Sequence, residues 1–360
     1  MIKVVALTSG MTVPSTRFRV RQHIAQLAQL GVEVSEYVPA IDKYIGVPGW
    51  PARQPLMLRL PFAALWAGAK LAVRAPGVAA SWRCDAVWLE RPLLEGFLTL
   101  EPLLGRPLIF DVDDAVWLAK PWGEQAARWI AQRATVVVAG NRYLAEWFGR
   151  WARDVRVVPT AVDTERFRAR DAAERDRFVI GWTGISPNFS FLYAIEAPLE
   201  RILRRLDDAE LLVVADRPPE FRRIDPRRVR FIAWSPATEA EAVRQMDVGL
   251  MPLADSEWAR GKCSFKMLQY MACGVPVVVS PVGMNADVLA MGEVGLVARD
   301  EQEWCEAIEL LYADRPRGRA YGAQGRAIVE RHFSRTVVAT QLAGIFQEIV
   351  QCTPAIPAQQ

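Results

Sequence analysis

The chain has 360 residues, of which 51% are hydrophobic and 24% are charged, and its formal net charge at pH 7 is +3. This composition is typical of a globular protein of about two domains, and so slight a charge gives no reason to expect a nucleic-acid partner. The apolar runs are too short to span a membrane, the two histidines exclude a His-rich metal site, and the five cysteines lack the spacing of a zinc site. We therefore expect a cytoplasmic protein with reduced thiols.

The first half of the chain predicts an all-parallel Rossmann-like domain. Buried strands are expected over residues 3–7, 32–38, 86–89, 107–110, 135–139 and 155–158, with a helix over residues 17–30. Strands that alternate with helices in this way form a doubly wound sheet. The loop after the first strand leads from Gly10 to Arg17 and Arg19, and these arginines fit either a contact with a phosphate or a solvated first helical turn.

Residues 50–82 are unusual for such a domain because they contain several Trp and Pro residues. Within this segment, residues 56–73 interleave apolar side chains, Trp66 among them, with basic ones. A basic amphipathic helix of this kind commonly covers a sheet. The pattern also suits a peripheral contact with an anionic membrane surface, and both interpretations stay open.

Three carboxylates follow the strand expected at residues 107–110. Asp111, Asp113 and Asp114 lie so close together at a strand end that they repel one another, which argues against a purely structural role for all three. One of them can cap the helical turn that follows.

Residues 161–176 are charge-rich and predict a linker to a second Rossmann-like domain. Its strands are expected over residues 177–182, 211–214, 229–232, 247–250, 275–279 and 294–297, and helices over residues 303–312, 323–332 and 337–350. We expect domains at residues 1–165 and 176–336, followed by a last helix and tail at residues 337–360. The first turn of the second domain contains Gly184, which allows a close approach of the backbone.

An anion site is predicted between the fourth and fifth strands of the second domain. It consists of Arg260, Lys262 and Lys266 at a helix start that Ser264 can cap, and Gln269 lies one turn further along the same helix face. Unpaired amides and the helix dipole make a helix start positive, and the basic side chains add formal charge, so a phosphate or diphosphate is the expected ligand. The alternative is an ordinary helix with solvated basic residues at its start.

The segment QYMACGVPVV at residues 269–278 resembles the motif E-G-F-G-x-x-x-x-E-A-M-A-x-G-x-P-V of the family 4 nucleotide-sugar glycosyltransferases, which have the GT-B fold. Two positions depart from that motif, since Gln269 replaces its second Glu and Gly261 stands where its first Glu is expected. The chain resembles a variant group with G-K-x-x-F-K-x-x-Q-Y-M-A-x-G-x-P-V. Outside this segment the resemblance is weak, although it extends over nearly the whole chain.

The resemblance implies an α/β fold of two Rossmann-like domains that face each other across a cleft, with a C-terminal helix that crosses back to the N-terminal domain. It implies that the basic residues of the anion site bind the donor diphosphate and that Gln269 contacts the ribose. Trp234 follows a strand where family members contact the base, although core packing explains it equally well. In the family, two basic residues near the first turn of the second domain contact the diphosphate, and Trp182 and Asn188 stand at these positions here.

The resemblance also bears on the three aspartates. Asp113 stands where the family has a His that contacts the donor sugar, and a carboxylate there can accept a proton or stabilise positive charge at the anomeric carbon. Asp111 and Asp113 also spell D-x-D, the metal motif of single-domain glycosyltransferases. We give the metal less weight because the basic helix start already supplies positive charge.

The resulting hypothesis is a glycosyltransferase that moves a sugar from a nucleotide diphosphate donor to a glycan, lipid-linked or small-molecule hydroxyl, with retention and without a metal or another cofactor. It would act in the cytoplasm or at the inner face of the membrane. The main alternative is a degenerate GT-B protein that binds a nucleotide or partner without catalysis. A nucleotide-sugar epimerase is the third hypothesis.

Overall fold

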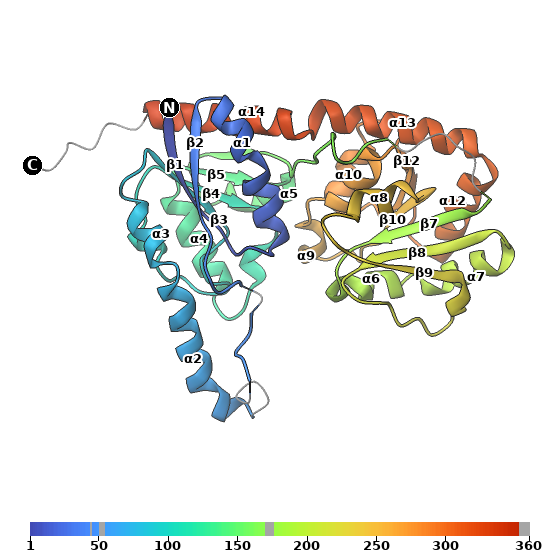
Figure 1. Cartoon of the computed structure of the whole chain (residues 1–360), viewed down its shortest axis with the longest axis horizontal. Helices are drawn as coiled ribbons and strands as arrows, with labels where there is room; N and C mark the ends of the chain where they lie inside the picture. The colour runs from blue at the N-terminus through green and yellow to red at the C-terminus, as the bar shows by residue number, and fades with distance from the viewer. Residues whose placement is uncertain (44, 50–54, 170–175, 353–360) are drawn as a thin grey trace, which may run out of the picture. The chain divides into compact units, whose positions relative to one another are not determined.

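The computed structural model describes residues 1–43, 45–49, 55–169 and 176–352, without the side chains of residues 56, 58 and 59. They form two compact units (Figure 1). Unit 1 comprises Met1–Ala161 together with the segment that begins at Arg335, and unit 2 comprises Val162–Ser334. The last described helix, α14 (Arg335–Cys352), therefore belongs with the N-terminal unit, as the family resemblance implies.

The described part of unit 1 is built on a six-stranded parallel sheet in the order β2-β1-β3-β4-β5-β6. The strands are β1 (Ile2–Leu7), β2 (Val32–Tyr37), β3 (Ala86–Glu90), β4 (Leu108–Val112), β5 (Val136–Ala139) and β6 (Val155–Val157). Every residue of β3, β4 and β5 is buried, which is expected of parallel strands covered on both faces.

Helices connect these strands in the right order for a Rossmann-like fold. They are α1 (Ile24–Gln29), α2 (Leu56–Ala72), α3 (Ala75–Ala80), α4 (Gly123–Arg133) and α5 (Arg142–Phe148). The helix predicted over residues 17–30 is irregular, because a π-helical turn at Thr16–Val20 and a 3-10 turn at Arg21–His23 precede α1. Helix α14 packs on the sheet through Phe346, whose ring meets that of Trp88 edge to face at 5.2 Å.

Helix α2 extends away from the sheet of unit 1 (Figure 1). The helix that covers β1 is α3, where a Cβ added to Gly77 would lie 2.4 Å from the side chain of Leu7. The side chains of Met57, Leu60 and Leu65 on α2 are 81%, 52% and 73% exposed. The interpretation of this segment as a helix that covers the sheet is therefore wrong.

The described part of unit 2 contains a second six-stranded parallel sheet, in the order β12-β11-β10-β7-β8-β9. Its strands are β7 (Phe178–Thr183), β8 (Ala209–Ala215), β9 (Val229–Ala233), β10 (Val248–Met251), β11 (Val277–Val279) and β12 (Gly295–Val297). Its helices are α6 (Phe189–Tyr193), α7 (Glu196–Arg205), α8 (Glu239–Arg244), α9 (Glu257–Arg260), α10 (Phe265–Ala272), α11 (Met284–Leu289), α12 (Glu301–Ala313) and α13 (Arg315–His332).

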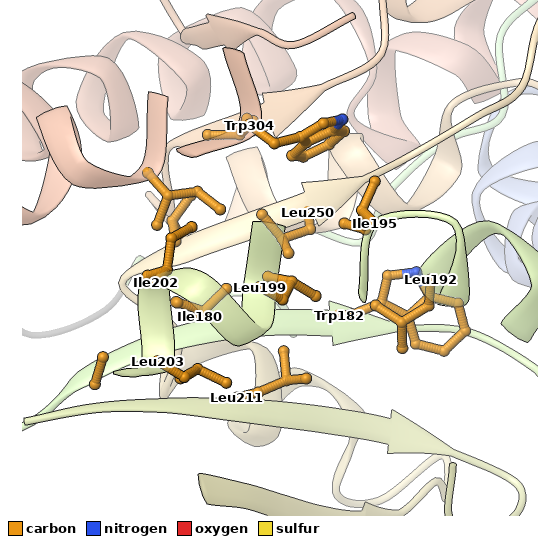
Figure 2. Close-up of a cluster of buried hydrophobic side chains, with 14 of the residues drawn as sticks. Ile180, Trp182, Leu192, Ile195, Leu199, Ile202, Leu203, Leu211, Leu250 and Trp304 are labelled. Atoms are coloured by element: carbon orange, nitrogen blue, oxygen red, sulfur yellow. The ribbon is translucent and has the colours of Figure 1, made fainter. Parts of the chain in front are cut away.

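Apolar side chains from one face of this sheet meet helices α7 and α12 in the core of unit 2. Ile180 and Trp182 of β7 point to the same face because side chains alternate along a strand, and Figure 2 shows them beside residues of α7. Trp304 of α12 lies in the same cluster. This packing fixes the indole of Trp182 near the end of β7.

The segment predicted as a linker is partly packed onto unit 2. The ring of Phe167 is buried, and the Arg326 guanidinium donates to the backbone carbonyls of Thr164, Phe167 and Ala272. Val162 pairs with Ser334 in a parallel bridge. The rest of the predicted linker, residues 170–175, lies outside the described residues.

Candidate functional site

The predicted donor-binding residues of unit 2 gather at one edge of its sheet. Because the strands are parallel, their carboxyl ends share an edge, and this edge of an open sheet is where ligands bind. Gly184 follows β7, Trp234 follows β9, and the loop with Lys262 follows β10. Gly184 and Lys262, which are 78 positions apart in the sequence (262 − 184), therefore lie at the same edge of the sheet.

Two lysines at this edge lie over tryptophan rings. The ammonium nitrogen of Lys266, in the first turn of α10, is 4.1 Å from the ring centroid of Trp182. The ammonium nitrogen of Lys262 is 3.5 Å from the ring centroid of Trp258. Burial and the nearby Lys262 ammonium lower the pKa of Lys266 to about 7. A second cation so close favours an anionic ligand over water, and these are the lysines that the sequence predicts for the diphosphate.

Gly184 makes the position of Lys266 possible. A Cβ at residue 184 would lie 2.5 Å from the Lys266 ammonium nitrogen and 2.4 Å from the indole of Trp182. Any larger residue would displace one of these two groups. The sequence predicts a close approach at Gly184, and in the structure the groups that approach this glycine are the side chains of Trp182 and Lys266.

Ser264 occupies the cap position of α10 but does not cap it as predicted. Its backbone is left-handed, with φ of 48°, and its hydroxyl donates to Asn285 Oδ1 at 2.6 Å. The Asn285 amide in turn donates to the carbonyl of Ser280 at 3.0 Å. These contacts tie the start of α10 to the segment after β11.

Arg260 is held by a carboxylate partner. Its guanidinium donates to both oxygens of Asp255, at 2.7 and 2.8 Å, and both side chains are about half exposed. These contacts favour a surface ion pair, so Arg260 is the weaker of the predicted diphosphate contacts.

Gln269 is buried and bonded to a carboxylate that sequence reasoning missed. Its Nε2 donates to Glu239 Oε1 at 2.7 Å, and Arg166 donates to Glu239 Oε2 at 3.1 Å. A carboxylate only accepts, so this contact fixes the amide of Gln269 with its NH₂ toward Glu239. The site therefore contains a negative charge beside residue 269 despite the Gln. The sequence held no signal for it, because Glu239 lies 30 residues away.

Trp234 is 36% exposed, directly after β9. Core packing, the alternative that the sequence left open, therefore does not account for this side chain.

Two of the predicted site residues in unit 1 bind each other inside the fold. Arg19 Nε and Nη2 each lie 2.8 Å from Asp111 Oδ1, and the indole of Trp88 donates to Oδ2 at 3.0 Å. Asp111 belongs to β4 and does not follow the strand as expected. Burial raises the pKa of Asp111 to about 6, against the effect of Arg19. These contacts argue for a structural role of Arg19 and Asp111.

Asp113 and Asp114 lie at the end of β4 beside an arginine that sequence reasoning passed over. Arg91 donates to Asp113 Oδ1 at 2.7 Å and lies 3.6 Å from Asp114 Oδ2. Arg91 has a φ of 64°, which is uncommon outside glycine and occurs often at functional sites. Burial opposes ionisation of Asp113, but Arg91 holds the pKa of that carboxyl below its ordinary value.

The first loop of unit 1 is packed around Gly10. A Cβ at this residue would lie within 2.5 Å of the Asp42 carboxylate, so only glycine fits beside it. Next to this loop, the buried carboxylate of Glu90 accepts from the backbone N–H of Ser9 and from the Thr16 hydroxyl, both at 2.9 Å. Arg17 lies over the ring of Phe18, with its guanidinium carbon 4.5 Å from the ring centroid.

Among the described residues, no three His, Cys, Asp or Glu side chains are placed to hold a metal ion. No helix in the described part of the chain has the length and hydropathy needed to cross a bilayer.

Two family models match this chain. Residues 18–166 match the one described as Glycosyltransferase Family 4, and residues 177–314 match the one described as Glycosyl transferases group 1. D-inositol 3-phosphate glycosyltransferase of Stackebrandtia nassauensis is 30% identical over 224 residues, which cover 55% of this chain and 49% of that protein. The chain thus matches about half the length of this curated relative.

Solved structures show the same fold. Sucrose-phosphate synthase from Thermosynechococcus elongatus has a TM-score of 0.70 at 15% identity, over 98% of this chain and 100% of that one. Anabaena HepE in complex with UDP and glucose has a TM-score of 0.69 at 14% identity, over 97% of this chain and 100% of that one. Two Rossmann-like units and these neighbours define a GT-B protein. The chain belongs to the family 4 glycosyltransferases.

Proposed function

We propose that this protein transfers a sugar from a nucleotide diphosphate donor to a hydroxyl acceptor. The observation that carries the proposal is the pair Lys262 and Lys266 at the carboxyl edge of the unit 2 sheet, where burial and the like charge of Lys262 lower the pKa of Lys266. They are the only two lysines in the sequence from residue 162 to residue 334. The fold neighbour HepE was solved with UDP-glucose, which supports a nucleotide sugar as the donor.

The remaining donor contacts follow from the same edge. Gln269, oriented by Glu239, presents its carbonyl oxygen as an acceptor for a ribose hydroxyl, and the exposed indole of Trp234 offers a face for the base. The acceptor is a glycan, a lipid-linked sugar or a small polyol bound by unit 1. The name of the inositol phosphate relative supports a hydroxyl acceptor of this last kind.

Asp113 is proposed as the charged group that acts in the transition state. Its pKa is held low by Arg91, so it is ionised at neutral pH and suits stabilisation of positive charge better than proton transfer. Transfer with retention and without a metal or another cofactor is part of the proposal, and it rests on the family resemblance. The rival proposal of a non-catalytic nucleotide-binding protein draws on the absence of the motif's two glutamates, which Glu239 offsets in part.

Calorimetry and donor hydrolysis test the proposal. UDP, GDP and dTDP would be titrated into the wild-type chain, and the matching nucleotide sugars assayed for hydrolysis. Lys266→Ala should raise the Kd of the preferred nucleotide at least about tenfold, because it removes a charge-assisted phosphate contact. Arg227→Ala is the matched control, since it removes an 89% exposed cation that precedes β9 at the opposite edge of the sheet. Nucleotide binding without any hydrolysis or transfer would favour the non-catalytic rival.

We also propose that unit 1 contacts an anionic membrane surface through the segment of residues 50–82, of which residues 50–54 lie outside the described residues. Residues 43–84 contain six basic residues and no Asp or Glu. The apolar side chains of Met57, Leu60 and Leu65 are exposed on α2. Exposed apolar side chains on a basic helix support interfacial binding, and a cytoplasmic face with anionic lipids would supply the partner.

A further inference from the structure

We propose that Trp258 is a positioning residue, which holds the Lys262 ammonium in place for the donor diphosphate and thereby favours a nucleoside diphosphate over a monophosphate. This inference rests on the proposed donor site of unit 2. It starts from the Lys262 ammonium, which lies 3.5 Å from the ring centroid of Trp258. An ammonium group this close to an indole face is attracted by the negative face of the ring.

The indole of Trp258 is itself fixed. Its ring lies parallel to that of Phe191, with 5.7 Å between centroids and 13° between planes. Phe191 belongs to α6, the helix that follows the Gly184 turn, and Trp258 belongs to the short helix α9, whose first turn is capped by Ser256. Phe191, Trp258 and Lys262 therefore connect the loop after β7 to the loop after β10.

An aromatic face holds a lysine without adding a negative charge. The Asp255 carboxylate beside Arg260 brings a negative charge to that cation, whereas the indole beside Lys262 brings none of its own. The lowered pKa of Lys266 agrees with this, because Lys262 still repels that second ammonium. Trp182 holds Lys266 in the same manner, at 4.1 Å.

Two neighbouring ammonium groups suit two linked phosphates. A diphosphate offers each lysine its own phosphate, whereas a monophosphate uses them less fully. If Trp258 orients Lys262 toward the second phosphate, then loss of the indole should weaken diphosphate binding more than monophosphate binding. A change that merely loosened the fold would weaken both ligands alike.

The test compares UDP, UMP and inorganic pyrophosphate by calorimetry on the wild-type chain and on two full-length variants. Trp258→Leu keeps an apolar side chain without a π-face, and we expect it to raise the Kd for UDP and for pyrophosphate about three- to fivefold, with less than about a twofold change for UMP. Trp258→Phe keeps a π-face and should restore most of the affinity. Thermal melting checks that each variant is folded.

A double-mutant cycle then separates positioning from a direct contact. If Trp258 acts through Lys262, adding Trp258→Leu to Lys262→Ala should change the Kd for UDP no further. Additive losses, or equal losses for UDP and UMP, would overturn the inference. Undiminished UDP binding by Trp258→Leu would also overturn it while leaving the donor site intact. Failure of the wild-type chain to bind UDP, GDP, dTDP or pyrophosphate would overturn both the inference and the proposed function.

Discussion

The cations at the carboxyl edges of the two sheets are held by different kinds of side chain. In unit 1, the carboxylates of Asp111 and Asp113 hold Arg19 and Arg91. In unit 2, an indole lies under the ammonium group of Lys266, and only a like charge and burial act on its pKa. Carboxylates of the protein thus neutralise Arg19 and Arg91, whereas the charge of Lys266 depends on pH and on the ligand.

The pKa of Lys266 makes donor binding depend on pH. A diphosphate favours the charged amine, so binding raises the lowered pKa and takes up a proton, and affinity falls as pH rises above about 7. The terminal phosphate ionises near pH 6, below this range. We expect the Kd for UDP to rise about fivefold from pH 7 to pH 8 in calorimetry. Lys266→Arg stays charged and should flatten the profile. A wild-type profile as flat as that of the Arg variant would contradict the expectation.

Asp113 should matter for turnover and not for donor binding. Asp113→Asn keeps the size of the side chain and its hydrogen bond to Arg91 but removes the charge, so we expect kcat to fall about a hundredfold with donor Kd nearly unchanged. Steady-state kinetics and calorimetry on one preparation measure the two effects. Normal turnover of this variant would leave Asp113 with a structural role, and loss of wild-type activity in a chelator would show that a metal is needed.

Helix α2 exposes apolar side chains that do not pack on the sheet of its unit. Met57→Glu with Leu65→Glu places two negative charges on its exposed apolar side chains. We expect co-sedimentation with phosphatidylglycerol vesicles to fall about tenfold or more, since both hydrophobic and electrostatic attraction are lost. Leu98→Glu with Met291→Glu, at residues that are 38% and 39% exposed, is the matched control. Equal binding of the two double variants to these vesicles would argue against α2 as the contact surface. Equal binding of the wild-type chain to neutral and to phosphatidylglycerol vesicles would argue against an anionic membrane as its partner.

The order and type of the elements could be predicted from sequence, because buried parallel strands are short apolar runs between helical patterns. Each predicted strand is present with ends within two residues of those expected. The irregular helix after β1 could not be predicted, since Thr16 and Arg19 there are drawn to Glu90 and Asp111, more than 70 residues away. The direction of α2 away from the sheet likewise could not be predicted, because the amphipathic pattern of residues 56–73 fits a helix on the sheet as well as a helix away from it.

The candidate site was predictable only in part. Gly184 directly follows β7, and Lys262 and Lys266 belong to the connection between β10 and β11, so the sequence could place them at the carboxyl edge of the sheet, where ligands of such folds bind. Glu239, Arg91 and Trp258 could not be assigned, because their roles depend on contacts made in three dimensions. Asp111 shows the opposite error, since β4 continues past residue 110 to Val112 and makes an apparent site residue a buried ion-pair partner.

For the molecule as a whole, the chain passes between its units at residues 161–162 and again at residues 334–335. Only part of the linker predicted at residues 161–176 can act as a hinge between the units, because Phe167 is packed into unit 2. We expect small-angle scattering to show a more compact particle with saturating UDP than without it, as domain closure around a ligand requires. An unchanged radius of gyration in a sample shown to bind UDP would contradict closure.

Unit 2 interrupts unit 1 in the sequence, and this sets an order of events during synthesis. On the ribosome, residues 162–334 emerge completely before α14, which supplies Phe346 to the ring of Trp88. Unit 2 can therefore finish folding while unit 1 still exposes the apolar surface that α14 will cover. The unit whose translation begins first is therefore the last to receive all of its residues.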